Sequence, residues 1–456
     1  TSYLRKLSLH TPAELFLELR TDRTLNLILG VVHNVIRDGV TVETVAEVWD
    51  AILWDCLLWL LHRTGRPRIG RAETLQHLKS VGIELCGSID AVIGTLSRNI
   101  QQVARENSGF ALERAASYLR GRHFDELKEY AIADLGRDET PALIVLDSLD
   151  DYPIRVDDMR KALSGLLKCA GEFNATLRNV DLRLCIPSEL YWSFIEDVST
   201  NPQKDFSSKL VVHWRVADLL VAVCRRLLIF LKLQHPRAYG LVNDNPLETR
   251  ADADAFLLAL FPRHIRNANG RHERIDLYLL RHTQLLPRQL ILILTEILRV
   301  NTVDDDFVPG STPFINENAV KLGVQEAETT IVDEIFSAYR DRFDDTPKQS
   351  CLAILPSLPR VFRNEDLNRA IKDYAEQHGR NIPSAPIRKM LLEVGVLGKL
   401  EREDSTYAYG KFEYTMTSRI AVGVQDRLCV HPLFSRVFDS VASDTDSPVF
   451  PSAADL

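Results

Sequence analysis

Residues 142–151, ALIVLDSLDD, decide the fold class of this chain. The stretch begins with five consecutive apolar residues, and an unbroken apolar run of this length is typical of a strand buried on both faces of a parallel sheet. The run ends in Asp147, which predicts a carboxylate at the carboxyl edge of the sheet, where open α/β folds bind ligands. These residues alone leave a second interpretation open, in which Asp147, Asp150 and Asp151 form only an acidic turn after a buried strand.

Patterns on both sides extend this strand into a sheet. Residues 180–187 (VDLRLCIP) and 209–214 (KLVVHW) predict two further strands, and the partial alternation in residues 13–19 (AELFLEL) predicts another. Residues 159–173 have helical spacing and separate the first two strands. The alternation of strand, helix and strand favours an α/β domain with a parallel sheet.

Most of the remaining N-terminal sequence has helical periodicity. Residues 1–10 predict a helix, and residues 25–135 predict four or five more, because their apolar residues recur at 3.6-residue spacing. We therefore expect residues 1–235 to form an α/β core that carries a helical insertion at residues 24–136.

The C-terminal half has a different organisation. Helical patterns continue up to residue 300, and residues 301–313 (NTVDDDFVPGSTP) combine an acidic run with Pro and Gly, which indicates a boundary. The expected parts are a helical, lid-like domain with its linker (236–325), a winged-helix domain (326–440) and a frayed tail (441–456).

The winged-helix expectation follows from the order helix, helix, hairpin. Helices are predicted at residues 365–378 and 384–394, and residues 396–400 and 412–416 can pair as a hairpin across residues 401–409. In DNA-binding proteins the second of these helices enters the major groove. Here the expected wing contains the acidic sequence EREDS, whose carboxylates would repel DNA phosphates. We therefore favour a structural or regulatory winged helix over a DNA reader.

The composition is that of a globular protein. The 456 residues are 45% hydrophobic and 26% charged, and this length predicts two or three domains. The net charge of −8 shows no large excess of basic residues, which would indicate nucleic-acid binding. No apolar segment reaches the ~18–20 residues that span a bilayer, and no signal peptide leads the chain, so we expect a cytoplasmic protein that does not bind a membrane.

Cysteine and histidine usage points to packing. The seven cysteines have no C-x-x-C spacing and mostly have apolar neighbours, so we expect reduced core thiols and no metal cluster. His431 lies between Val430 and Pro432 without a Cys or His partner at metal spacing, and we interpret it as a packing histidine.

The order of four segments along the chain bears on the family that the chain resembles. Residues 1–7 (TSYLRKL) begin a helix, Asp147 ends an apolar strand, Ser188 follows the next strand, and residues 286–290 (LPRQL) place Pro-Arg at a helix start. This order resembles the signal-transduction (STAND/AAA+-like) P-loop ATPases, especially bacterial members with a helical insertion and a C-terminal winged helix. The resemblance spans residues 1–435. It implies a mixed α/β and mainly helical fold, built from a P-loop-ATPase-like parallel sheet, a large helical insertion, a helical domain and a C-terminal winged helix.

The resemblance assigns roles to the first and second of these segments, with ATP and Mg²⁺ as cofactors. Thr1 and Ser2 would follow a G-x-x-x-x-G-K-[ST] loop and bind the nucleotide, with Thr1 as a hydroxyl ligand of Mg²⁺. Asp147 would be the catalytic acid that holds Mg²⁺ through its water shell. Asp150 and Asp151 would polarise water or shape the metal site.

The other two segments would complete the nucleotide site. Ser188 matches a polar sensor position, and Arg288 matches a second sensor that reaches the γ-phosphate. The residues alone leave plainer roles open, since Ser188 also suits a helix N-cap and Arg288 an exposed helix start. Other arginines could act as an arginine finger or form a solvated surface: Arg225, Arg226, Arg263, Arg266 and Arg271.

Two departures from the family pattern accompany these assignments. The glycine-rich loop and its lysine are not in the chain. We expect an ATPase if that loop precedes Thr1 in the full protein, and a degenerate scaffold if it does not. Ser148 follows Asp147 where related AAA+ proteins carry a glutamate as catalytic base.

Three functions are therefore carried forward. The first is an ATP-dependent molecular switch in bacterial signalling or antiviral defence, acting on a protein partner or effector as a homo-oligomer. The second is a degenerate, non-hydrolysing scaffold in which the apolar helix at residues 50–61 forms an assembly interface. The third, less favoured, is an ATP-dependent DNA-binding protein similar to origin-recognition ATPases.

Overall fold

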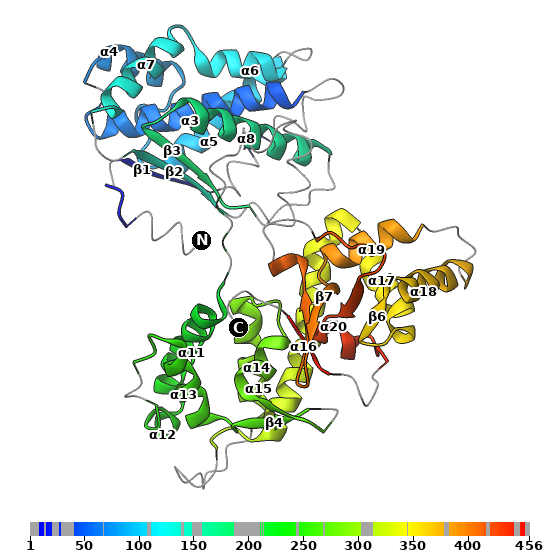
Figure 1. The fold of residues 1–456 in the computed structure, drawn as a ribbon. Coiled ribbons are helices and arrows are strands. Elements are labelled where there is room, and N and C mark those ends of the chain that lie inside the picture. The colour runs from blue at the N-terminus through cyan, green and yellow to red at the C-terminus, as the bar shows by residue number, and fades with distance from the viewer. Residues whose placement is uncertain are drawn as a thin grey trace. The chain divides into compact units, whose positions relative to one another are not determined.

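The chain folds into two compact units, Thr1–Lys209 and Leu210–Leu456, which are described separately (Figure 1). The fold is mixed α/β and mostly helical. The computed structural model describes residues 9–12, 15–20, 27–28, 41–66, 68–106, 111–137, 141–147, 157–186, 210, 212, 214–242, 246–267, 270–301, 313–343, 345–377, 383–415, 420–441 and 447–451.

The first unit contains a parallel three-stranded sheet in the order β1-β2-β3. The strands are β1 (Phe16–Arg20), β2 (Ala142–Asp147) and β3 (Val180–Leu184), so the strands predicted from residues 13–19, 142–147 and 180–187 are confirmed. The central strand β2 is buried on both faces, which explains its unbroken apolar run.

The expected strand at residues 209–214 is not found. Its described residues, Leu210, Val212 and Trp214, belong to no strand and expose their apolar side chains. Within the described residues, the three strands of this sheet are β1, β2 and β3.

The described residues between 42 and 135 form five helices, as the 3.6-residue spacing predicted. The longest, α3, contacts each of the other four and also α8, which connects β2 to β3. The indole nitrogen of Trp49 donates a hydrogen bond to the carbonyl oxygen of Ala162, 3.0 Å away, and so joins α3 to α8. These helices are α3 (Val42–Arg63), α4 (Arg71–Ser80), α5 (Ile89–Glu106), α6 (Ala111–Arg120), α7 (Phe124–Leu135) and the crossover α8 (Asp157–Thr176).

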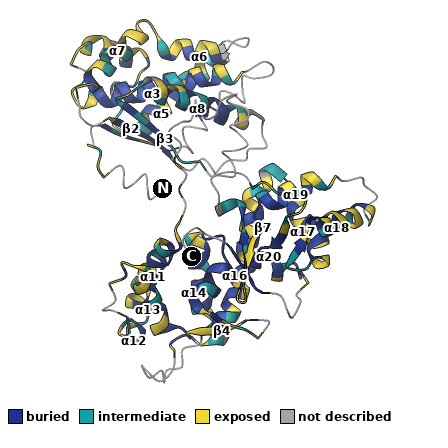
Figure 2. Cartoon of the chain, in the orientation of Figure 1, coloured by how far each residue is buried: buried dark blue, intermediate teal, exposed yellow. Residues whose placement is uncertain are grey.

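The burial of α3 overturns one expectation. Every residue from Ala51 to Leu61 is buried inside the first unit (Figure 2). The predicted assembly interface at residues 50–61 is therefore wrong, because neighbouring helices of the same chain already cover this apolar helix.

The second unit begins with a helical part. The helix α11 packs on α12, α13 and α15, so it belongs here and not to the core expected to extend to residue 235. A short antiparallel hairpin, β4-β5, precedes α14. The elements are α11 (Val216–Gln234), α12 (Pro236–Tyr239), α13 (Arg250–Leu260), β4 (His264–Arg266), β5 (His272–Arg274), α14 (Ile275–Arg281), α15 (Pro287–Val300) and α16 (Glu317–Phe343).

The helix α16 crosses the boundary expected between residues 325 and 326. It is one continuous helix of 27 residues, and it packs on α15 of the helical part and on α20 of the following part. Its close contact with α15 requires Gly323, because a Cβ atom there would lie 2.5 Å from the backbone of Ile297. The two C-terminal parts therefore share one helix and one continuous hydrophobic core.

The rest of the second unit is built on a five-stranded sheet in the order β10-β8-β7-β9-β6. The predicted order of two helices and an antiparallel hairpin is present as α18, α19, β7 and β8. The elements are α17 (Thr346–Ile354), η2 (Leu355–Ser357), β6 (Val361–Arg363), α18 (Asn364–Gln377), α19 (Ser384–Glu393), β7 (Leu397–Glu403), β8 (Ala408–Lys411), η3 (Glu413–Thr415), β9 (Arg427–Val430), α20 (Pro432–Val437) and β10 (Val449–Pro451).

Two details of this part differ from expectation. The hairpin pairs residues 399–403 with residues 408–411, so the charged sequence expected in the loop lies partly in β7. The expected tail contributes β10, whose three residues are buried and pair in parallel with β8.

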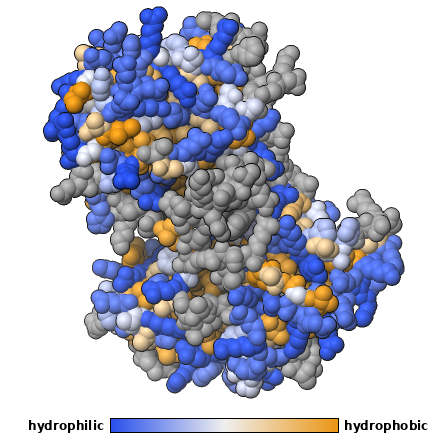
Figure 3. All heavy atoms as spheres, turned by 45° about the horizontal axis from the view of Figure 1, so that its top comes forward, coloured by the Kyte–Doolittle hydropathy of each residue, from blue (hydrophilic) through white to orange (hydrophobic). Residues whose placement is uncertain are grey.

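The surface and the thiols agree with the composition. The face drawn in Figure 3 is mostly hydrophilic, with apolar residues in small groups. All seven cysteines are free thiols, and five of them are buried. Within the described residues, no helix is long and apolar enough to cross a membrane.

Candidate functional site

The sequence-predicted site residues are described only in part. Asp147 is the last residue of β2, at the carboxyl end of the central strand, where its backbone pairs in register with Arg20 of β1. The remaining predicted residues of the first unit lie outside the described residues: Thr1, Ser2, Asp150, Asp151 and Ser188.

The local environment explains how β2 holds Asp147. Ile144 and Leu146 belong to the large core beneath α3 and α8, whereas Leu143 and Val145 belong to a smaller cluster on the opposite face. The strand is therefore packed on both faces, and its last residue, Asp147, lies at the carboxyl edge of the sheet.

Arg288 belongs to the second unit, whereas Asp147 belongs to the first. It follows Pro287 at the start of α15, and its side chain is exposed. This position agrees with the plainer interpretation of Arg288 as an exposed residue at a helix start.

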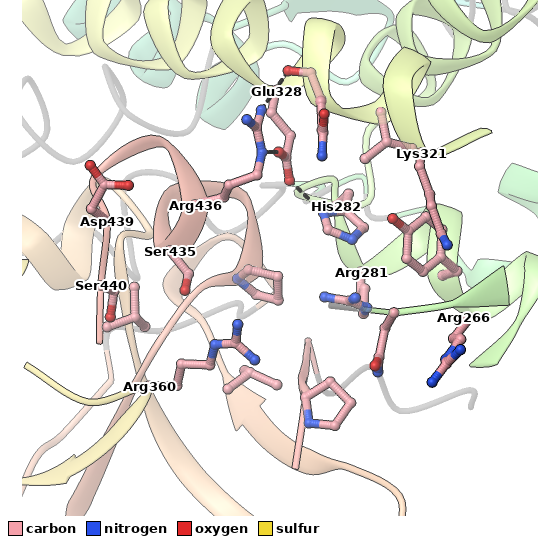
Figure 4. A pocket seen from close by; sticks show the side chains of 18 residues that line it. Arg266, Arg281, His282, Lys321, Glu328, Arg360, Ser435, Arg436, Asp439 and Ser440 are labelled. Atoms are coloured by element: carbon pink, nitrogen blue, oxygen red, sulfur yellow. Dashed lines mark hydrogen bonds and ion pairs between the residues drawn. The ribbon is translucent and has the colours of Figure 1, made fainter. Parts of the chain in front are cut away.

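Sequence reasoning missed a cavity inside the second unit. It has a volume of about 380 Å³ and lies between the helical part and the five-stranded part (Figure 4). Its walls come from β4, α14 and α16 on one side and from the residue before β6, α20 and β10 on the other. Two buried carboxylates, Glu328 and Glu273, connect the two sides.

Glu328 is the first of these carboxylates. It projects from α16, it is fully buried, and both of its oxygens are paired. Its Oε1 atom lies 2.5 Å from Nδ1 of His282, and its Oε2 atom accepts a hydrogen bond from Nε of Arg436 on α20. Arg436 also donates to the backbone oxygen of Gln325, 2.5 Å away, so one side chain joins α20 to α16 at two points.

Glu273 is the second buried carboxylate. It accepts two hydrogen bonds from the guanidinium of Arg281, at 2.8 and 3.1 Å, in a bidentate arrangement. The hydroxyl of Tyr407, near the start of β8, donates to Glu273 at 3.4 Å, and Asn267 donates to it at 2.6 Å. This network therefore also joins the helical part to the sheet part.

The imidazole of His282 has one unsatisfied nitrogen. Burial and the neighbouring charge of Arg281 lower the pKa of His282, which favours the neutral ring. Because the carboxylate of Glu328 can only accept, Nδ1 carries the proton and Nε2 is left with a lone pair. That Nε2 atom is buried and has no hydrogen-bond partner.

His431 is a packing residue, as the sequence predicted. It is fully buried, its Nδ1 accepts a hydrogen bond from the backbone of Leu433, and its Nε2 lies 2.7 Å from the hydroxyl of Tyr414. Burial is the main cause that lowers the pKa of His431 to about 3. The ring therefore caps α20 as a neutral group.

A weak sequence signal for the cavity existed. Glu328 interrupts the apolar stripe of α16, where Val324 and Ile331 precede and follow it at helical spacing. A glutamate in such a stripe must be paired when it is buried, but the sequence does not reveal that its partners come from α14 and α20. Among the described residues, no group of three or more metal-ligating side chains is found.

Comparisons with protein-family models, with curated proteins and with solved structures found no match to this chain.

Proposed function

We propose that the chain is an ATP-dependent molecular switch of the STAND/AAA+-like P-loop ATPase class. The observation that carries this proposal is the parallel order β1-β2-β3 with Asp147 at the carboxyl end of the central strand. Ligands of open parallel sheets bind at this edge, and a carboxylate there is suited to a hydrated Mg²⁺ ion.

The donor chemistry fits Mg²⁺ and ATP. Mg²⁺ bound to nucleotide phosphates takes only one or two protein carboxylates, so a single acid at this edge meets the requirement. Asp147 would hold the ion, and Thr1 and Ser2 would bind the phosphates next to it. Asp150, Asp151 and Ser188 are proposed to complete the site, and Mg²⁺ would supply charge neutralisation at the phosphates.

The second unit is proposed to be the part that responds to the nucleotide. We interpret α18, α19 and the hairpin β7-β8 as a winged helix, and α16 as the element that couples it to the helical part. A continuous helix of 27 residues is about 40 Å long, at about 1.5 Å per residue. Because α16 packs on both parts, we propose that it transmits a displacement from one part to the other.

The contacts of the proposed winged helix favour a regulatory role over DNA reading. On α19, Arg388 donates to the Asn364 side chain at 3.0 Å. On β7, Glu401 and Glu403 remain acidic surface groups, each in an ion pair with a neighbouring strand. The basic residues next to this surface are therefore already paired within the fold, which disfavours their use in binding a phosphate backbone.

The proposed partner is a protein effector in bacterial signalling or antiviral defence, and a homo-oligomer is the proposed assembly. The alternative of a non-hydrolysing scaffold has lost its suggested interface, because residues 51–61 are buried within the first unit. The switch is therefore the function that the described geometry supports best.

The test is ATP turnover by the complete gene product and by two matched variants. Asp147→Asn removes the charge at the carboxyl edge, whereas Asp181→Asn makes the same change near the amino end of β3. We expect turnover to fall by about 100-fold or more in Asp147→Asn, since removal of a group that stabilises transition-state charge costs about 10²–10³ in rate. We expect Asp181→Asn to retain it. Equal ATP turnover in the two variants would contradict the assignment of Asp147 as a magnesium ligand.

A further inference from the structure

The helix α11 exposes a cluster of large apolar side chains. Ile229, Phe230 and Leu233 lie close together in the sequence and keep 61%, 39% and 71% of their surface exposed. A helix at a protein surface ordinarily turns polar residues outward, and neighbouring exposed apolar side chains mark a surface that a partner covers. The cluster is therefore a candidate binding surface.

Positive side chains border this cluster. Arg225, Arg226 and Lys232 are exposed on the same helix, and within the described residues none of them forms an ion pair with a carboxylate. The Nε atom of Arg225 donates to the backbone oxygen of Leu247 at 2.8 Å, which positions the side chain but leaves its charge uncompensated. Because the chain as a whole has a net charge of −8, this positive charge is a local feature of α11.

The apolar and positive residues share one side of the helix. At about 100° per residue they fall within a sector of about 160° around the helix axis. Ile229 and Leu233 lie at the centre of this sector, and the cations lie on both flanks of it. This α11 face consists of Arg225, Arg226, Ile229, Phe230, Lys232 and Leu233.

The core of the second unit supports the α11 face. Eight other residues of the helix are buried and hold it in place. The ring of Phe230 lies 5.6 Å from the ring of His235, which in turn lies 5.6 Å from the ring of Phe314. A surface that is already formed loses little conformational entropy on binding, so its apolar contacts contribute more fully to affinity.

We propose that the α11 face binds an acidic amphipathic helix of a partner protein. Ile229 and Leu233 are four residues apart and form a ridge that fits between the side chains of a second helix. Acidic side chains of the partner would pair with the cations, which have no such partner among the described residues of the fold. The α11 face belongs to the second unit alone, so the proposal does not depend on nucleotide binding at Asp147.

A protein helix suits the α11 face better than an anionic membrane does. A helix that lies on a membrane inserts a long apolar side into the lipid. The exposed apolar residues of α11 span little more than one turn, and its eight buried residues keep the helix in the core of the second unit. A surface of this size predicts a transient complex, with a dissociation constant on the order of micromolar.

Fluorescence anisotropy of a labelled peptide, titrated with the complete chain at constant ionic strength, tests the proposal. The probe is a peptide of Leu, Glu and Ala, about 20 residues long so that it forms a helix, with Leu at positions i, i+3, i+4 and i+7. One control peptide has the same composition with Leu distributed around the helix, and the other has Lys in place of every Glu. We expect saturable binding of the probe and at least about tenfold weaker binding of both controls.

Four variants locate the binding. Leu233→Gln and Lys232→Gln change the α11 face, whereas Leu322→Gln and Lys389→Gln make the same changes at exposed positions of α16 and α19. We expect Leu233→Gln to weaken binding of the probe about fivefold or more, because it removes apolar contact area. Lys232→Gln should weaken it about threefold, and the two controls should bind as the wild type does. All four positions are exposed, so we expect each variant to fold.

Other occupants of the α11 face give different results. Absence of saturable binding, equal binding of the three peptides, or equal weakening in Leu233→Gln and Leu322→Gln would overturn the proposal. Cosedimentation of the wild type with phosphatidylserine vesicles that is lost in Leu233→Gln would assign the face to a membrane instead. A dimer in sedimentation equilibrium that dissociates in Leu233→Gln but not in Leu322→Gln would assign it to a second copy of the chain. We expect neither of these two results.

Discussion

Glu328 offers the sharpest test of how the second unit is held together. The substitution Glu328→Gln keeps the size of the side chain but removes the charge that lies between His282 and Arg436. The glutamine amide can serve both partners only if its oxygen faces Arg436 and the neutral ring of His282 moves its proton to Nε2. In every arrangement the substitution removes the charge-assisted interactions of Glu328 that join α16 to His282 and to α20.

The expected cost follows from burial. Removal of one partner from a buried ion pair costs about 3–5 kcal/mol when the remaining charge stays buried. Glu328 is fully buried, but the side chain of Arg436 is 45% exposed and can be rehydrated, which reduces the cost. We expect Glu328→Gln to lower the free energy of unfolding of the second unit by about 2–3 kcal/mol.

Hydrogen exchange of peptides from α16 measures this loss locally. A cost of 2–3 kcal/mol corresponds to exchange that is roughly 30- to 150-fold faster where opening controls it. Glu334→Gln, on an exposed position of the same helix, is the matched control and should change stability by less than about 0.5 kcal/mol. If Glu328→Gln and Glu334→Gln exchange alike, the carboxylate of Glu328 does not hold the two parts together and the reasoning fails.

The remaining predictions concern buried charge and helix packing. Burial raises the pKa of Asp55 to about 6, so its contribution to stability is greatest below pH 4 and is lost as pH rises toward 6. Asp55→Asn should remove about 2–3 kcal/mol of the change in the free energy of unfolding between pH 4 and pH 7. Unfolding of the wild type and the variant, followed by tryptophan fluorescence at each pH, measures this difference. If the free energies of unfolding of the two proteins change with pH in parallel, the prediction is wrong. Gly323→Ala should destabilise the second unit by at least about 1 kcal/mol in denaturant titrations, because its Cβ would meet the backbone of Ile297. Gly94→Ala, in an exposed helix position with open space around it, should instead stabilise the first unit by about 1 kcal/mol, and the same sign for both substitutions would contradict the close packing of α15 and α16.

The sheet of the first unit was predictable because its signal is local. The apolar run of β2 reflects burial on both faces, whereas β3 alternates the buried residues Val180 and Leu182 with half-buried charged residues. The strand expected at residues 209–214 had a similar pattern, but a strand also needs a neighbour to pair with. Pairing is a property of the whole fold, and no described strand adjoins Leu210, Val212 or Trp214.

The C-terminal organisation was predictable only in outline. The order of α18, α19 and the hairpin follows from local periodicity and turn residues, whereas the parallel pairing of β10 with β8 joins residues about forty positions apart along the chain. The boundary expected at residue 325 failed because α16 is a continuous helix with apolar contacts on both sides of it. The sequence has the same helical periodicity on both sides of residue 325, so it cannot mark a boundary between two parts that share one helix.

The candidate sites differ in the same way. Asp147 could be predicted as a site residue because it directly follows an apolar run, and this feature is visible in the sequence itself. The cavity could not be found, because Arg281, Glu328, Arg360 and Arg436 come from four separate elements. Only a glutamate within an apolar stripe indicated that a buried ion pair would form.

The measurement that most directly tests the proposed switch is hydrogen exchange of the complete gene product with and without Mg·ATP. The account predicts that Mg·ATP changes the exchange of second-unit peptides from α16, β9 and α20 in the wild type and in Asp181→Asn, and that Asp147→Asn shows no such change. Identical exchange of the second unit with and without Mg·ATP in the wild type would contradict the account, since the nucleotide would then have no effect on the part proposed to respond to it.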